Sequence, residues 1–227
     1  MRVRRLSARV PGVTATENEG RRDVGCVDPS ADPDDTRQSS RTFPHAADTL
    51  LKMSLILGYD PTTLRERVDL LEVGRRLDEL GEMRSLDALS ERAWLLKVTG
   101  RLDEAMDIAN QALRLARFTG DRKDILRPRI LRAQVLQYSA HFAEATAELT
   151  ACIDEAHTQG WRALESVALQ HRGKVAFDQA LYEEALDDFT ASVALREKLG
   201  ASSDQLESTL IAVAVTESFI DEQRKRG

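Results

Sequence analysis

The side chains that could bind a metal or attack a substrate are few in this sequence. Histidine and cysteine stand at six positions: His45, His141, His157, His171, Cys26 and Cys152. Zinc sites need such residues in pairs at short, defined spacings, and no two of these six form such a pair. We therefore predict no metal site and no disulfide. Because Cys152 shares a repeat position with Ala112 and Ser192, we expect it to be a small packing residue.

Catalytic motifs are also missing. The sequence contains no GxSxG, HExxH, GxxxxGK[ST] or GxGxxG pattern. Neighbouring carboxylates such as Glu183-Glu184 and Asp187-Asp188 lie in a strongly charged stretch, which is typical of a solvated helix face and not of an acid–base pair. We predict that the protein is not an enzyme and uses no cofactor.

Residues 1–45 differ in composition from the rest of the chain. They contain four of the six prolines and a single aromatic residue, Phe43. So little apolar surface cannot offset an ordering entropy of roughly 1–2 kcal/mol per residue. We predict that 1–45 is a disordered tail or an over-long annotated start.

Charge and hydropathy exclude two classes of partner. Without the eight arginines and seven acidic residues of 1–45, the chain has 24 basic and 31 acidic residues, a net charge of −7. Nucleic acid needs a concentrated positive surface, so we expect no nucleic-acid partner. No apolar run approaches the ~18 residues of a membrane span, and none has the form of a secretory signal. We expect a cytoplasmic protein with no membrane contact.

The elements that must position any site repeat every 40 residues. The segments Leu102–Ala105, Phe142–Ala145 and Tyr182–Ala185 align at this spacing without a slip. Apolar or small residues recur at helical spacing inside each unit, and a glycine closes it, so each unit is predicted to be two antiparallel helices. Several columns obey the same shift: Arg92, Arg132 and Arg172; Ala93, Ala133 and Gly173; Leu113, Ile153 and Val193; Gly120, Gly160 and Gly200.

The arginine column raises the question of ion pairs with a glutamate column of the second helices. Arg92 and Glu104 lie at unequal distances from the turn between the helices, so antiparallel helices would not set them opposite each other. The equivalent pairs are Arg132 with Glu144 and Arg172 with Glu184. We expect both columns to be architectural, with pairing only between units, where an exposed pair contributes ~0.2–1 kcal/mol.

These residues resemble the tetratricopeptide repeat family, whose unit has small residues at fixed places in both helices and a small residue at the turn. The positions that carry the resemblance are Ala93, Leu96, Gly100, Leu102, Ala105 and Ala112 in the first unit, with equivalents 40 and 80 residues on. The family's usual unit is ~34 residues, so this sequence is similar to the elongated repeats of kinesin light chains and bacterial regulators. The resemblance implies an all-α fold, an α-solenoid of helix hairpins in a right-handed superhelix.

The flanks complete the predicted organisation. Residues 62–80 are expected to form a second helix whose partner is 46–57, and one further helix caps the stack after Gly200. The apolar core of that last helix leaves open a homodimer through it. The predicted segments are 1–45 (tail), 46–82 (weak or partial repeat), 83–120, 121–160 and 161–200 (repeats), and 201–227 (capping helix).

The resemblance also implies a binding face, because the first helices of such stacks line the concave surface that holds extended partners. In this sequence the predicted groove consists of Trp94, Lys97, Gln134, Gln137, Tyr138, Gln170, Lys174 and Phe177. Amides can bond a peptide backbone, aromatic rings can hold apolar side chains, and the two lysines can meet a carboxylate. A plainer interpretation is that Trp94 and Phe177 only pack between neighbouring units.

We therefore expect a protein–protein interaction module or scaffold that binds a peptide segment or helix of a partner protein. The alternative is a regulatory sensor of a small diffusible peptide. An open groove further predicts that Lys97 and Lys174 can be replaced by Glu without unfolding the chain. The identity of the partner is not encoded in any motif.

Overall fold

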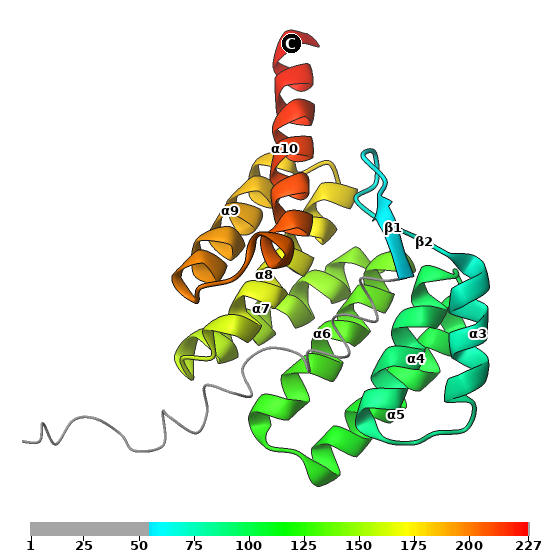
Figure 1. The fold of residues 1–227 in the computed structure, drawn as a ribbon. Helices are drawn as coiled ribbons and strands as arrows, with labels where there is room; N and C mark the ends of the chain where they lie inside the picture. Colours follow the sequence, from blue (N-terminus) through cyan, green and yellow to red (C-terminus); the bar gives the residue numbers. More distant parts are fainter. Residues whose placement is uncertain (1–54, 227) are drawn as a thin grey trace, which may run out of the picture. The chain divides into compact units, whose positions relative to one another are not determined.

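The structure is a computed structural model that describes residues 55–226, all within one compact unit, Ser40–Gly227. The predicted tail 1–45 and residues 46–54 of the predicted first repeat lie outside the described residues. The described part is mostly helical (Figure 1). Its helices are α3 (Leu70–Leu80), α4 (Leu86–Val98), α5 (Leu102–Thr119), α6 (Arg122–Tyr138), α7 (Phe142–Thr158), α8 (Arg162–Asp178), α9 (Tyr182–Lys198) and α10 (Ser203–Arg226).

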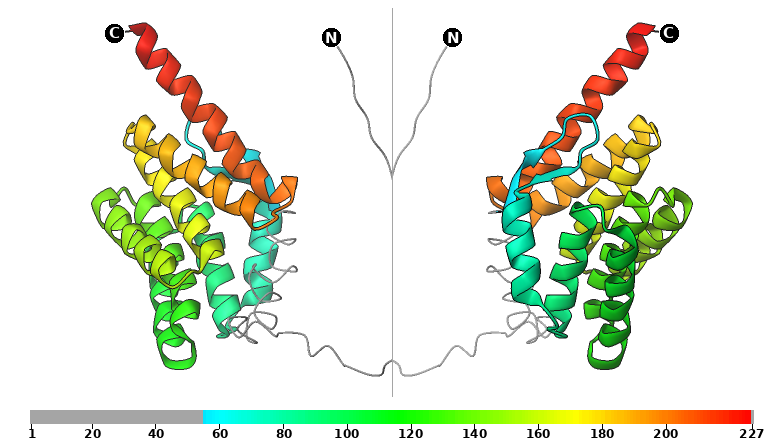
Figure 2. Two further views of the ribbon diagram at one scale, coloured as in Figure 1. Left: turned by 90° about the vertical axis from the view of Figure 1, so that its left-hand side faces the viewer. Right: turned by 90° about the vertical axis from the view of Figure 1, so that its right-hand side faces the viewer.

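Consecutive helices pack as pairs. The pairs are α4 with α5, α6 with α7 and α8 with α9, and each pair packs on the next through α5 and α6, or α7 and α8 (Figures 1 and 2). The first helices also contact one another, α4 with α6 and α6 with α8. The first helices of the three pairs therefore lie along one face of the unit.

The turn inside each pair has the same backbone geometry. Gly100, Ala140 and Ala180 all have positive φ, of 79°, 60° and 59°. In each turn the next residue donates its N–H to the carbonyl five residues earlier, for example His141 to Leu136 at 2.9 Å. This is the left-handed helix end that glycine adopts freely, so the two alanines hold a conformation that is costly for a residue with a Cβ.

Small residues bring the paired helices together, and their sizes vary in a compensating way. Position 173 is glycine where the earlier pairs have alanine, and position 189 across from it is phenylalanine where the second pair has Leu149. A Cβ added to Gly173 would lie 2.7 Å from Phe189 Cε1 and 3.1 Å from the Ala185 carbonyl oxygen. Phe189 is fully buried, so the missing Cβ is what admits its ring.

The arginine column does form ion pairs inside its own units, which corrects the expectation of pairing only between units. Arg132 binds Glu148 at 2.5 Å and Arg172 binds Asp188 at 2.7 Å. Each partner lies 16 residues on, as far after the turn alanine as the arginine lies before it. Arg92 has an isoleucine at that distance and donates instead to the Gly81 carbonyl at 2.8 Å.

The region before the first complete pair differs from the prediction. Residues 62–80 were expected to be one helix, but only α3 is helical, and Asp69 caps its N-terminus by accepting from Leu71 and Glu72 N–H groups at 3.0 and 3.2 Å. Residues 56–68 form an antiparallel hairpin of β1 (Ile56–Tyr59) and β2 (Glu66–Val68). The turn is set by Asp60, whose carboxylate accepts from Thr62 and Thr63 N–H groups at 2.8 and 2.9 Å.

The last helix, α10, packs on α9 and buries Ala212 and Ile220. Its Leu210 is 46% exposed, and the homodimer through this helix stays a prediction. Among residues 55–226, no helix combines the length and the apolar character needed to cross a bilayer.

Candidate functional site

The eight predicted groove residues lie on α4, α6 and α8, the face shared by the first helices. Their side chains do not line open solvent. Seven are buried and Tyr138 is half-buried; Lys97, for example, is 1% exposed. The chain's own hairpin, drawn in cyan between α3 and α10 (Figure 1), contacts Lys97, Tyr138 and Lys174 on this face.

Glu66 of β2 is the centre of the contact. Its carboxylate accepts from Lys174 Nζ at 3.1 Å and from the Tyr138 hydroxyl at 2.5 Å, and Lys97 Nζ lies 3.7 Å away. The Glu66 side chain is 8% exposed. Burial alone raises the pKa of Glu66, but the two ammonium groups and the hydroxyl outweigh it and hold that pKa well below its ordinary value. One carboxylate is therefore held ionised between two buried cations.

Arg65 is bound beside it. Its guanidinium pairs with Asp178 at 3.1 Å and lies over the Tyr138 ring, 4.1 Å from the centroid. Gln137 donates to the same Asp178 oxygen at 3.0 Å. Burial raises the pKa of Asp178, although Gln137 and Arg65 both act to lower it.

Leu64 fills an apolar cluster next to these ions. It is 2% exposed and belongs to one cluster with Phe177 of α8, Phe189 of α9 and Ala212 of α10. Leu64 also has a φ of 55°, a left-handed backbone that is strained for a leucine. Three successive residues, Leu64-Arg65-Glu66, are thus recognised by the helices through an apolar pocket, an anion and two cations.

The remaining predicted residues have other surroundings. Gln134 accepts from Lys97 at 3.1 Å, which joins α4 to α6. Gln170 bonds Ser208 of α10 at 3.0 Å and accepts from Arg196 of α9 at 2.5 Å. Trp94 lies in the core cluster around α4, and Phe177 stacks edge-on with Tyr182 and Phe219 at 5.2 and 5.3 Å. The plainer interpretation, in which these two aromatic residues pack, describes their contacts.

Sequence reasoning missed the residues that complete the site. Leu64, Arg65 and Glu66 stand in a stretch expected to be helical, and Tyr59 of β1 places its ring 5.5 Å from Lys174 Nζ. The local signals were Asp60-Pro61, a common turn start, and the β-forming residues of 56–59 before it.

His171 of α8 lies near the same cations. Its Nδ1 is buried without a hydrogen-bond partner among the described residues. Burial and the nearby Lys174 and Lys97 hold the pKa of His171 well below its ordinary value, so the imidazole is neutral at pH 7.

Cys152 lies in the core, as its repeat position predicts. Burial raises the pKa of its thiol to about 11, which makes it a poor nucleophile. Within residues 55–226, no group of three or more His, Cys, Asp or Glu side chains is placed to hold a metal ion.

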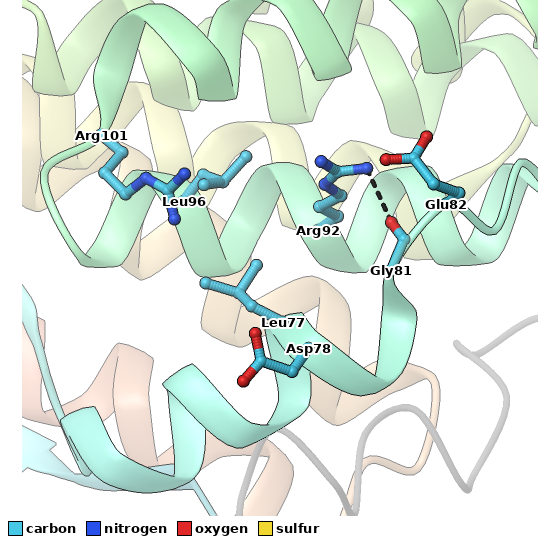
Figure 3. Close-up of a pocket in the computed structure, with 7 residues that line it drawn as sticks. All are labelled: Leu77, Asp78, Gly81, Glu82, Arg92, Leu96 and Arg101. Carbon is cyan, nitrogen blue, oxygen red and sulfur yellow. Dashed lines mark hydrogen bonds between the residues drawn. The ribbon is translucent and has the colours of Figure 1, made fainter.

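A separate polar pocket of about 290 Å³ lies between α3, α4 and the turn after α4 (Figure 3). It is lined by Leu77, Asp78, Gly81, Glu82, Arg92, Leu96 and Arg101. Both arginines already have partners within the chain, Arg92 with the Gly81 carbonyl and Arg101 with Glu104 at 2.6 Å. The pocket therefore carries no functional assignment.

Comparison of the chain with known protein families, curated proteins and solved structures finds no match. The site must be interpreted from its own geometry.

Proposed function

We propose that this protein is an interaction module of the tetratricopeptide type, an α-solenoid whose inner face, formed by α4, α6 and α8, binds an extended segment of a partner protein. The 40-residue spacing, the three helix pairs and their common left-handed turn support this architecture. The single observation that carries the function is the hairpin itself. This face already holds the stretch Leu64-Arg65-Glu66 by side-chain contacts from all three helices, Lys97 of α4, Tyr138 of α6 and Lys174 of α8.

The proposal is tested by placing a photo-reactive amino acid in the full chain. Position 138 of α6 lies on the inner face, and Phe118 of α5, 88% exposed, is the matched control on a second helix. A partner recovered from native lysate is expected to cross-link from position 138 and not from 118. Cross-linking from 118 alone would contradict the inner-face assignment. If no protein is recovered, while short peptides raise the melting temperature, the sensor alternative is favoured.

A further inference from the structure

We propose that residues 55–69 are a built-in competitor that closes the inner face, and that the partner segment which displaces them carries an apolar, a basic and an acidic residue in succession. This inference rests on the proposed function and names both the partner chemistry and its regulation. The model for the partner is the chain's own Leu64-Arg65-Glu66.

Another polypeptide can make the contacts by which the helices hold this stretch. Among residues 55–226, the backbone of this stretch bonds within the hairpin: β2 pairs with β1, and Asp60 N–H donates to the Arg65 carbonyl at 2.9 Å. The helices recognise the hairpin through side chains, with Asp178 on Arg65 and Lys174 on Glu66. A partner segment that presents the same three side chains in this geometry, with a turn at the apolar residue, can make these contacts.

The hairpin is a small element that can open while the helices stay folded. A two-stranded hairpin has little stability by itself, so its place depends on the side chains that dock. The docked conformation includes a strained backbone at Leu64, which opening relieves. On the outer side, Leu57 of β1 is 64% exposed and Thr62 and Thr63 at the turn are exposed. Local opening of such a segment requires less free energy than global unfolding.

The buried charges of the inner face limit which segment can replace the hairpin. Lys97 and Lys174 are buried and sit on either side of the Glu66 carboxylate. When the hairpin leaves, Lys174 loses the carboxylate that pairs with it at 3.1 Å, and a purely apolar occupant cannot replace that carboxylate. The open face therefore selects an occupant with a carboxylate at this place, and Asp178 selects a cation beside it.

The consequence for affinity follows from the competition. A partner binds only the open fraction of molecules, so its apparent dissociation constant is the intrinsic value divided by that fraction. Weakening the hairpin must tighten partner binding, although the partner touches none of the altered residues.

The experiment measures binding of a synthetic peptide with the sequence of residues 60–69 to three full-length chains: wild type, Glu66→Gln and Glu72→Gln. Glu72 provides the matched control, since its half-exposed carboxylate pairs with Arg75 of the same helix at 2.8 Å and not with the inner face. Glu66→Gln is expected to bind the peptide roughly tenfold tighter than wild type, with Glu72→Gln unchanged. A peptide carrying Gln in place of the equivalent of Glu66 should bind roughly tenfold more weakly.

Equal affinity of all three chains would refute the competitor role and leave the binding face intact. No binding to any chain, with the hairpin opened in Glu66→Gln, would refute the proposed function as well. A Glu66→Gln chain that dimerises and rejects the peptide would assign the occupant to a second copy, contrary to the proposal.

A second measurement needs no variant. Hydrogen exchange of wild type reports the amides of Asp60, Leu64 and Asp69, which bond within the hairpin segment. We expect them to exchange at least about tenfold faster than the core amides of α8. Exchange in step with α8 would show that the hairpin opens only when the whole unit unfolds, and would overturn the inference.

Discussion

The close approach of α8 and α9 at Gly173 can be tested by adding back the missing Cβ. In Gly173→Ala the new atom would lie 2.7 and 2.8 Å from Phe189 Cε1 and Cδ1, and 3.1 Å from a carbonyl oxygen. The Phe189 ring is fully buried and cannot move into solvent. Overpacking of this kind costs about 1–3 kcal/mol.

Helix propensity acts in the opposite direction, because alanine is better than glycine in a helix by up to about 1 kcal/mol. Gly74 of α3 isolates this term, since an added Cβ there has no atom within 4 Å. We therefore expect Gly74→Ala to stabilise the protein by roughly 0.5–1 kcal/mol. Gly173→Ala is expected to be neutral or destabilising by up to about 2 kcal/mol.

A second substitution tests whether the cost of Gly173→Ala comes from its contact with Phe189. Adding Phe189→Leu to Gly173→Ala gives the third pair the same combination as Ala133 and Leu149 in the second. Phe189→Leu alone should cost about 1–2 kcal/mol through the space it leaves. In the double variant the added methyl occupies part of that space, so the two changes should couple favourably by about 1–3 kcal/mol.

Urea unfolding followed by circular dichroism at 222 nm measures each free energy of unfolding, provided that the m-values agree. Two results would refute the packing argument. One is a Gly173→Ala variant as stable as Gly74→Ala. The other is a double variant whose cost is the sum of the two single costs.

Three further changes test other parts of the structure. Ala140→Gly should raise the free energy of unfolding by roughly 0.5–1 kcal/mol, because relief of the left-handed strain exceeds the added chain entropy; a loss in urea unfolding would contradict this. His171 has a depressed pKa, so below about pH 6.5 the unfolded chain binds a proton that the folded chain does not, and stability falls by up to ~1.4 kcal/mol per pH unit. His171→Gln should flatten that slope in urea titrations between pH 7.5 and 5.5, and an unchanged slope would refute the assignment. Lys97→Glu should lower the free energy of unfolding by roughly 3–5 kcal/mol, because it removes a buried cation and places a second carboxylate beside Glu66. The exposed control Lys198→Glu should lower it by less than about 1 kcal/mol. Thermal melts distinguish the two variants.

The helix pairs could be predicted because their information is local and repeated. Alanines at helical spacing, a small residue at the turn and a glycine at the unit end recur three times, so each unit supports the interpretation of the others. The resemblance implied the face of the first helices, and the structure places α4, α6 and α8 in contact along one face. The sequence also contains the signal for the arginine partners, since Arg132 and Glu148 lie at equal distances from the turn residue Ala140.

The hairpin could not be predicted in the same way. Apolar residues recur at helical spacing at Leu64, Val68 and Leu71, so periodicity favoured one continuous helix. The structure places residues 61–68 in a turn and in β2, and the helix begins only at Leu70. What overrides that pattern is tertiary: Glu66 meets Lys97, 31 residues away, and Lys174, 108 residues away. No local window contains either pair. The expectation that both lysines tolerate replacement by Glu depended on an open groove, and their burial gives the opposite expectation.

Several residues that contact the hairpin lie at positions where the third helix pair differs from the earlier pairs. Only the third pair combines glycine at 173 with phenylalanine at 189, and Phe189 belongs to the apolar cluster that takes Leu64. The third pair also supplies Lys174 and Asp178, where the equivalent positions of α6 carry Gln134 and Tyr138. This lysine and this aspartate, one helical turn apart on α8, bind the neighbouring residues Glu66 and Arg65 of the hairpin. The repeat therefore builds the face, and residues by which its last unit differs make the contacts to Leu64, Arg65 and Glu66 in turn.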